Sequence, residues 1–199
     1  MTKNILISFL ILSSCASVDT ESPYTEVFSG IGSYLLDRKQ DVSDEFVDIF
    51  PYSFAIVSIG RSPEYRLVLV NIVNDTYEWI SADYVRIFTK KGRIVKTIGL
   101  QHDVEFKKYS DISNNLPLTV NSLIVDYIEP QLYNVILEVK YKHQNNIVME
   151  EFSSSILNWN GLNLYKISDS GDVIETEQSI HPFVPKIKMK FYIKKNSAK

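Results

Sequence analysis

Residues 51–100 read PYSFAIVSIGRSPEYRLVLVNIVNDTYEWISADYVRIFTKKGRIVKTIGL. Val, Ile, Tyr and Phe are abundant here and suit a pleated, half-buried surface, while Gly and Pro interrupt the apolar runs. The stretch predicts two β-hairpins, with strands Phe54 to Ile59 and Tyr65 to Val73, then Tyr84 to Thr89 and Arg93 to Ile98. Glu78 to Asp83, which includes Trp79, is expected to join them. No catalytic pattern occurs in this stretch.

The remainder of the chain also indicates strands. Tyr133 to Lys142 alternates between apolar and polar residues, which is typical of a strand with one face in water. Lys186 to Ile193 alternates in the same way. Further strands are expected at Val104 to Lys107, Ile147 to Ile156, Leu162 to Ile167 and Val173 to Glu177. Thr119 to Tyr127 fits either a strand or an irregular segment.

Apolar residues recur at helical spacing before the β region. The pattern predicts a helical segment over Tyr24 to Leu36 and a short helix within Val42 to Phe50, which Pro51 ends. With roughly ten antiparallel strands after it, the expected fold is mainly β. We predict a single domain over residues 24–199, built as a large antiparallel sheet that forms a half-barrel or a partly open barrel.

Composition limits the classes of function. A chain of 199 residues with 45% hydrophobic content supports one domain with a real core. Its net charge of −3 argues against a nucleic-acid partner. The single cysteine allows no disulfide within the chain and no zinc cluster made of cysteines.

The N-terminus has the pattern of a secretion signal. Lys3 precedes the apolar run Ile5 to Leu12, which is far shorter than the roughly 20 residues that span a bilayer. Leu12-Ser13-Ser14-Cys15 resembles the bacterial lipobox. It predicts a signal peptide over residues 1–14, lipidation of Cys15 and a tether over residues 15–23. Because Ala16 replaces the Asp that commonly retains enterobacterial lipoproteins at the inner membrane, we expect an outer-membrane anchor facing the periplasm.

The order of features resembles a known family. Pro51-Tyr52-Ser53 opens a strand, Trp79 is followed by Ser81 and Asp83, and Gly92 to Thr97 is followed by Gly99-Leu100. Together with the lipobox, they resemble the YjbF/GfcB (YmcC-like) family of bacterial outer-membrane lipoproteins. That resemblance implies an antiparallel β half-barrel and a setting in capsule or exopolysaccharide production and export. It implies no catalytic mechanism.

No residue pattern predicts a catalytic, metal or cofactor site. His102, His143 and His181 are far apart and lack metal-ligand spacing. Each is expected at a strand end or in a loop. Asp103 and Glu105 form a weak carboxylate cluster that a solvated strand edge explains. No serine lies in a Gly-x-Ser-x-Gly elbow.

Several residues are candidates for contact with a glycan. Trp79 and Trp159 can stack on a pyranose, although a lone tryptophan in a β domain more often belongs to the core. Arg93 and Lys96 can contact an acidic sugar, or can pair with a cross-strand carboxylate such as Asp83. The row Lys186, Lys188 and Lys190 can bind acidic polysaccharide or lipid headgroups, or can protect a sheet edge from aggregation.

These observations lead to one main hypothesis and two alternatives. The main hypothesis is a non-enzymatic outer-membrane lipoprotein that assists polysaccharide assembly or export, through glycan binding or docking on export proteins. The first alternative is a periplasmic carrier that holds an acyl chain in the concave face of the half-barrel. A hydrolase of envelope glycans is the third.

Overall fold

The computed structural model describes residues 44–113 and 121–194, which contain one helix and twelve strands. The helix α2 spans Asp44–Ile49. The strands are β1 (Phe54–Ile59), β2 (Tyr65–Val73), β3 (Thr76–Ile80), β4 (Arg86–Lys90), β5 (Arg93–Ile98), β6 (Val104–Lys108), β7 (Asn121–Tyr127), β8 (Leu132–Gln144), β9 (Ile147–Ser154), β10 (Trp159–Ile167), β11 (Val173–Gln178) and β12 (Ile187–Tyr192). No helix within these residues is long and apolar enough to cross a membrane.

The sheet closes into a barrel. Every strand pairs antiparallel with the next one, and β1 also pairs with β12, with Phe54 opposite Tyr192 and Ile59 opposite Ile187. The expected half-barrel or partly open barrel is therefore wrong, although the mainly antiparallel β class is confirmed. The physical reason lies in β1, whose first four residues are all buried and whose two edges both find partners. Pairing both edges satisfies backbone groups that an open sheet would leave exposed.

Closure of the barrel also argues against the alternative function, a carrier of an acyl chain. An acyl chain was expected in the concave face of a half-barrel. In the described part of the chain the sheet leaves no such open face, and the interior holds large side chains such as Trp79, Tyr141 and Tyr165 together with an ion pair.

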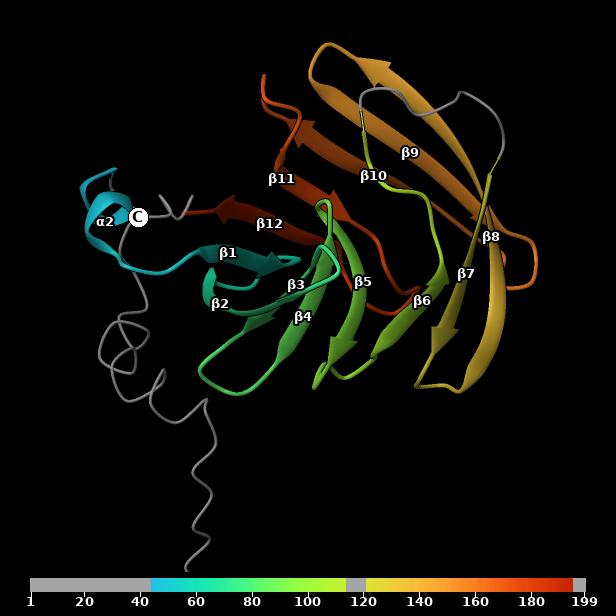
Figure 1. The fold of residues 1–199 in the computed structure, drawn as a ribbon. Helices are drawn as coiled ribbons and strands as arrows, with labels where there is room; N and C mark the ends of the chain where they lie inside the picture. The colour runs from blue at the N-terminus through green and yellow to red at the C-terminus, as the bar shows by residue number, and fades with distance from the viewer. Residues whose placement is uncertain (1–43, 114–120, 195–199) are drawn as a thin grey trace, which may run out of the picture.

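Strands β5 and β11 contact one another across the interior, although they are not neighbours in the sheet. Figure 1 shows them passing between β1–β4 and β12 on one side and β7–β10 on the other. The contact is close because Gly92 has no side chain, and a Cβ there would overlap Val173. The Gln178 side chain bridges the same strands, since its amide donates to the Gly92 carbonyl (2.9 Å) and accepts from the Ile94 N–H (3.1 Å).

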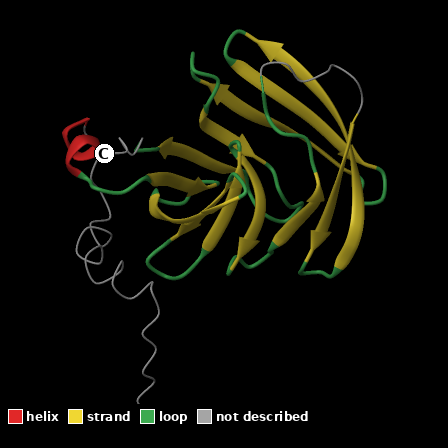
Figure 2. Cartoon of the chain, in the orientation of Figure 1, coloured by secondary structure: helices red, strands yellow, loops and turns green. Residues whose placement is uncertain are grey.

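Helix α2 packs on the outer wall, beside the start of β1 (Figure 2). Its Phe46, with Phe50 after it, covers Phe54, and Val68 joins the same small cluster outside the main core. The Arg66 guanidinium lies 4.5 Å above the Phe46 ring. This helix confirms the expectation for Val42 to Phe50. The helix expected over Tyr24 to Leu36 lies outside the described residues.

The strand predictions agree well with the structure, with one omission. The bounds of β1, β2 and β5 are those expected. The segment Thr119 to Tyr127, which fitted either a strand or an irregular segment, contains β7. The expected link Glu78 to Asp83 is wrong in part, because Thr76–Ile80 is the strand β3. Asn74 and Asp75 both have positive φ, which lets the chain reverse within two residues and makes β3 easy to miss.

Candidate functional site

The candidate site is an open groove in the part of the barrel wall formed by β8, β9 and β10, which we call the Trp159 groove. It has a volume of about 460 Å³ and lies where β8 passes the turn between β9 and β10. Its wall is formed by Ile136, Glu138, Ser153, Ser154, Ser155, Ile156, Asn158, Trp159 and Asn160.

The sequence of β8 and β9 explains why polar side chains line part of the groove. In β8 the buried residues are Val135, Leu137, Val139 and Tyr141, so Ile136 and Glu138 lie on the outer face. Glu138 is opposite Ser153 of β9, which is also exposed. Strand alternation thus places a carboxylate and a hydroxyl side by side on the outer wall.

Trp159 is held at the start of β10. Its ring is half-buried and lies 4.6 Å from the Phe152 ring in an edge-to-face contact. Phe152 in turn lies over Gly161, where any side chain would overlap the ring. These contacts fix the tryptophan at the groove and pack it against the core.

The turn between β9 and β10 supplies hydrogen-bonding groups. Asn158 has a φ of 46°, a conformation that asparagine tolerates better than most residues. The Ser154 hydroxyl accepts from the Leu157 N–H at 3.4 Å, which ties the turn to β9. Ser153, Ser155, Asn158 and Asn160 are all exposed, so their hydroxyl and amide groups can bond a ligand. Among the groove residues Glu138 alone is charged.

Trp79 does not lie at the surface. Its relative exposure is 0%, and its indole N–H donates to the Thr89 hydroxyl at 2.8 Å. The rings of Tyr77 and Phe191 lie 6.0 and 5.5 Å from it. The expectation of a sugar contact at the surface is therefore wrong for Trp79, since inward alternation of β3 places it in the core.

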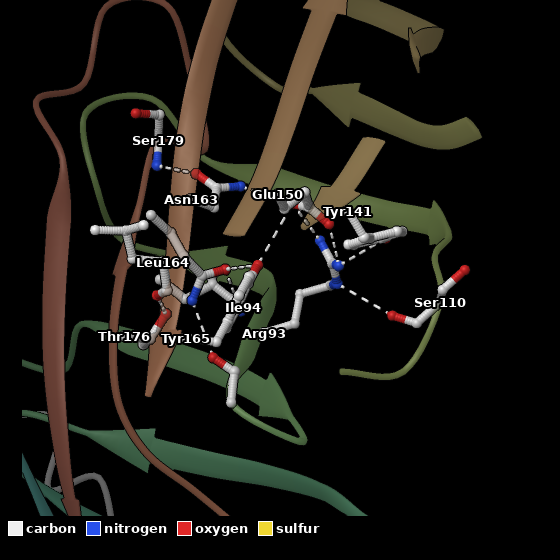
Figure 3. A network of polar contacts seen from close by, with 12 residues as sticks. Arg93, Ile94, Ser110, Tyr141, Glu150, Asn163, Leu164, Tyr165, Thr176 and Ser179 are labelled. Carbon is white, nitrogen blue, oxygen red and sulfur yellow. Dashed lines mark hydrogen bonds and ion pairs between the residues drawn. The ribbon is translucent and has the colours of Figure 1, made fainter. Parts of the chain in front are cut away.

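Arg93 is also buried, at 1% exposure. Its guanidinium contacts both oxygens of Glu150, through Nη1 to Oε1 at 3.0 Å and through Nη2 to Oε2 (Figure 3). Nη2 also donates to the Tyr141 hydroxyl (3.3 Å), and Nε donates to the Ser110 carbonyl (3.4 Å). The expected contact with a glycan is wrong for Arg93. Its partner is Glu150 of β9 rather than a carboxylate such as Asp83.

Glu150 is surrounded by other donors. Asn163 donates to its Oε1 at 2.8 Å, and the Tyr165 hydroxyl lies 3.5 Å from the same oxygen. Burial disfavours the charge on both partners. The pair nevertheless stays ionised, because Arg93 lowers the pKa of Glu150 and Glu150 raises the pKa of Arg93.

The remaining candidate cations lie on the outer wall. Lys96 of β5 pairs with Glu105 of β6 at 3.5 Å, which is a cross-strand pair with a different carboxylate from the one expected. Lys186 and Lys188 both pair with Glu177, at 2.8 and 3.2 Å, and Lys190 lies 5.2 Å from the centre of the Tyr192 ring. Edge protection is wrong as an explanation, because β12 is hydrogen-bonded on both sides.

Two histidines meet although the sequence separates them. The rings of His102 and His181 are stacked, with centroids 4.8 Å apart and planes 9° apart. His102 Nδ1 lies 2.7 Å from the Glu129 carbonyl, and His181 Nδ1 accepts from the Phe183 N–H at 3.1 Å. In the described ranges no three His, Cys, Asp or Glu side chains are arranged to hold a metal ion.

Comparison with known families identifies the chain. A family model described as group 4 capsule polysaccharide lipoprotein GfcB, YjbF, matches residues 24–123. The chain belongs to the YjbF family. The family is one of capsule-associated lipoproteins, which supports a role in capsule or exopolysaccharide and a membrane-anchored location.

A solved structure agrees with the YjbF assignment. The hypothetical lipoprotein YmcC from Escherichia coli (K12) superimposes with a TM-score of 0.64 at 18% identity, and the match covers 85% of this chain and 96% of that one. At this identity the likeness shows a shared fold. No curated protein sequence matches this member of the YjbF family. Cys15, the expected lipidation site, lies outside the described residues.

Most residues that line the groove of this YjbF member were not predicted from the sequence. Only Trp159 among the predicted contacts lines it. A usable signal was present, since Ser153-Ser154-Ser155 and Asn158-Trp159-Asn160 place hydroxyls and amides on both sides of a short turn. The burial of Glu150 could also have been predicted, because it occupies the inward position between the apolar Val148 and Phe152.

Proposed function

We propose that this chain is a non-enzymatic outer-membrane lipoprotein, anchored through acyl chains on Cys15 and facing the periplasm, that assists capsule or exopolysaccharide assembly by binding the glycan. The membership in a capsule-associated family supports the setting. The Trp159 groove supports glycan binding over docking on export proteins.

The observation that carries this proposal is the make-up of the groove. A pyranose has an apolar face and a rim of hydroxyls, and protein sites bind it by combining an aromatic surface with a few polar side chains. Trp159, three serines and two asparagines line one open groove of about 460 Å³. An open groove suits a polymer, because a long chain can enter and leave without passing through a closed cavity.

The test is binding of purified polysaccharide fragments from the producing strain to the mature chain. We expect saturable binding by calorimetry, and about a tenfold loss when Trp159→Ala and Asn160→Ala are combined, which corresponds to 1.4 kcal/mol. Tyr133→Ala is the matched control, because Tyr133 is an exposed aromatic residue of β8 that does not line the groove. Equal weakening by the control would contradict the groove assignment.

A second experiment tests the role in the cell. Deletion of the gene should lower the amount of surface polysaccharide, and the groove variant should reproduce the defect at normal protein level. Unchanged polysaccharide in the deletion strain would refute the proposed function. A defect that the groove variant fully complements would point to docking on export proteins instead.

A further inference from the structure

The register of three strands sets a row of polar side chains in the Trp159 groove. Glu138 of β8 is opposite Ser153 of β9, and Ser153 is opposite Asn160 of β10. All three are exposed and line the groove. The Cβ atoms of directly opposite residues lie about 4.5–5.5 Å apart. A carboxylate, a hydroxyl and an amide can therefore bond neighbouring groups of one ligand.

An apolar edge borders this row. Ile136 lies two residues before Glu138, so strand alternation places both on the same face of β8. Ile136 is 50% exposed, and Ile156, in the turn after β9, is 71% exposed. Both line the groove. Covering such apolar area is favourable, and a ligand in the groove can reach it.

The Glu138 carboxylate is available to a ligand. Among residues 44–113 and 121–194 no cationic side chain forms an ion pair with it, and Lys142, farther along β8, pairs with Glu151 instead. An ionised carboxylate accepts hydrogen bonds and donates none. The groove thus favours a ligand group that combines an N–H or O–H donor with an apolar part.

An acetamido group has this combination. Its N–H can donate to Glu138, its methyl can cover Ile136, and its carbonyl can accept from the Asn160 amide. A sugar hydroxyl in the same place supplies a donor but no methyl. A free ammonium group also lacks the methyl, so neither uses the apolar edge.

We propose that the Trp159 groove selects sugars that carry an acetamido group, with the N–H at Glu138 and the methyl against Ile136. This inference rests on the proposed function, because it names the class of sugar that the same groove recognises. N-acetylglucosamine and N-acetylgalactosamine both present this group on a pyranose ring.

The first test compares chitotetraose with cellotetraose. The two share ring configuration and linkage, and they differ only in an acetamido or a hydroxyl group on the second carbon of each sugar. We expect calorimetry on the mature chain to show about tenfold tighter binding of chitotetraose, which corresponds to 1.4 kcal/mol.

Variants then locate the methyl group. Ile136→Ser should reduce the preference for chitotetraose to about twofold, and the fold should persist because the side chain is half exposed. Ile72→Ser is the matched control, because Ile72 of β2 is 54% exposed and does not line the groove. It should keep the full preference.

A second pair of variants locates the N–H. Glu138→Ala removes the acceptor and should weaken chitotetraose binding about tenfold. Glu138→Gln keeps an acceptor oxygen without the charge, so it should restore most of the affinity. Equal affinity of Glu138→Ala and the wild type would contradict this placement of the acetamido group.

The outcomes separate this inference from the proposed function. Equal binding of the two tetraoses, a preference that survives Ile136→Ser, or its loss in Ile72→Ser would overturn the acetamido assignment. So would failure of both tetraoses while purified polysaccharide fragments bind, which would leave the proposed function in place. Binding of chitotetraose without binding of the fragments would contradict the proposed function alone, and failure of every probe would contradict both.

Discussion

Arg93 of β5 and Glu150 of β9 form a two-point ion pair inside the barrel, although their strands are not neighbours in the sheet. Removing one partner leaves a buried charge without compensation, which typically costs about 3–5 kcal/mol. We expect Arg93→Met or Glu150→Gln to lower the free energy of unfolding by about this amount. Urea unfolding of the single and double variants measures it, and the double variant should lose much less than the sum. Additive losses would mean that the two side chains act independently.

The same pair predicts loss of stability in acid. The pKa of Glu150 is lowered in the folded state, so its contribution is complete above the unfolded pKa and is lost as pH falls through the folded value. Unfolding free energy should therefore fall steeply below about pH 4 in the wild type. In the double variant of Arg93 and Glu150 this part of the pH dependence should flatten. A profile identical to that of the wild type would contradict the prediction.

A separate effect at milder pH comes from His181. Burial, and then the neighbouring His102, lower the pKa of His181 to about 4 from an ordinary value near 6.5. Between these values the unfolded chain binds more protons, so stability should fall as pH drops from about 6.5 to 4. His181→Phe should remove this slope, while His143→Phe, which is away from the stack, should keep it. Retention of the slope in His181→Phe would exclude this histidine as its cause.

Gly92 and Gly171 offer a matched pair for testing the contact between β5 and β11. Both have positive φ, 80° and 89°, but a Cβ on Gly92 would overlap Val173 whereas Gly171 has open space. Gly171→Ala should cost about 1 kcal/mol for the backbone alone. Gly92→Ala should cost about 1–3 kcal/mol more, because the core must shift. Thermal unfolding of the two variants measures the difference, and equal losses would show that the contact is loose.

Charge at the Trp159 groove should control which glycans bind. Glu138→Lys reverses the only charge among the groove residues. We expect affinity for fragments with uronic acids to rise about fivefold and affinity for fragments with amino sugars to fall. A fivefold change corresponds to about 1 kcal/mol, which is the upper range for an exposed ion pair. Glu64→Lys, exposed in the turn after β1, controls for net charge. An equal change of glycan affinity in both variants would mean that the charge at the groove does not determine which glycans bind.

The lipid anchor is tested at the one cysteine. Cys15→Ser should leave the protein without its acyl chains, because the serine hydroxyl cannot replace the sulfur that accepts the diacylglyceryl group. Fractionation should then show the protein in the soluble periplasm, with Ser14→Ala as a control that stays in the membrane. Persistence of Cys15→Ser in the membrane fraction would contradict the anchor.

Local patterns predicted the strands well where one physical signal dominated. In Phe54 to Ile59 and Tyr65 to Val73, β-branched and aromatic residues and flanking turn residues agreed, and the bounds match β1 and β2. Strand β3 was missed because Asn74 and Asp75 turn the chain in two residues and Glu78 interrupts the apolar run.

Properties that depend on distant residues could not be predicted in the same way. Whether β12 has a free edge depends on β1, more than a hundred residues earlier. The burial of Arg93 depends on Glu150, 57 residues later, which no local pattern links to it. Trp159 was identified as a candidate by its residue type, but the serines and asparagines around it become a groove only once β8 lies beside β9.

The pairing of β1 with β12 has a consequence for biogenesis. The first strand of the ring receives its second partner from the last strand of the ring, so a chain that is still being synthesised carries an unsatisfied edge along Phe54–Ile59. The barrel can therefore close only after β12 has been made. Deletion of Ile187–Tyr192 would leave two open edges able to recruit strands from other molecules.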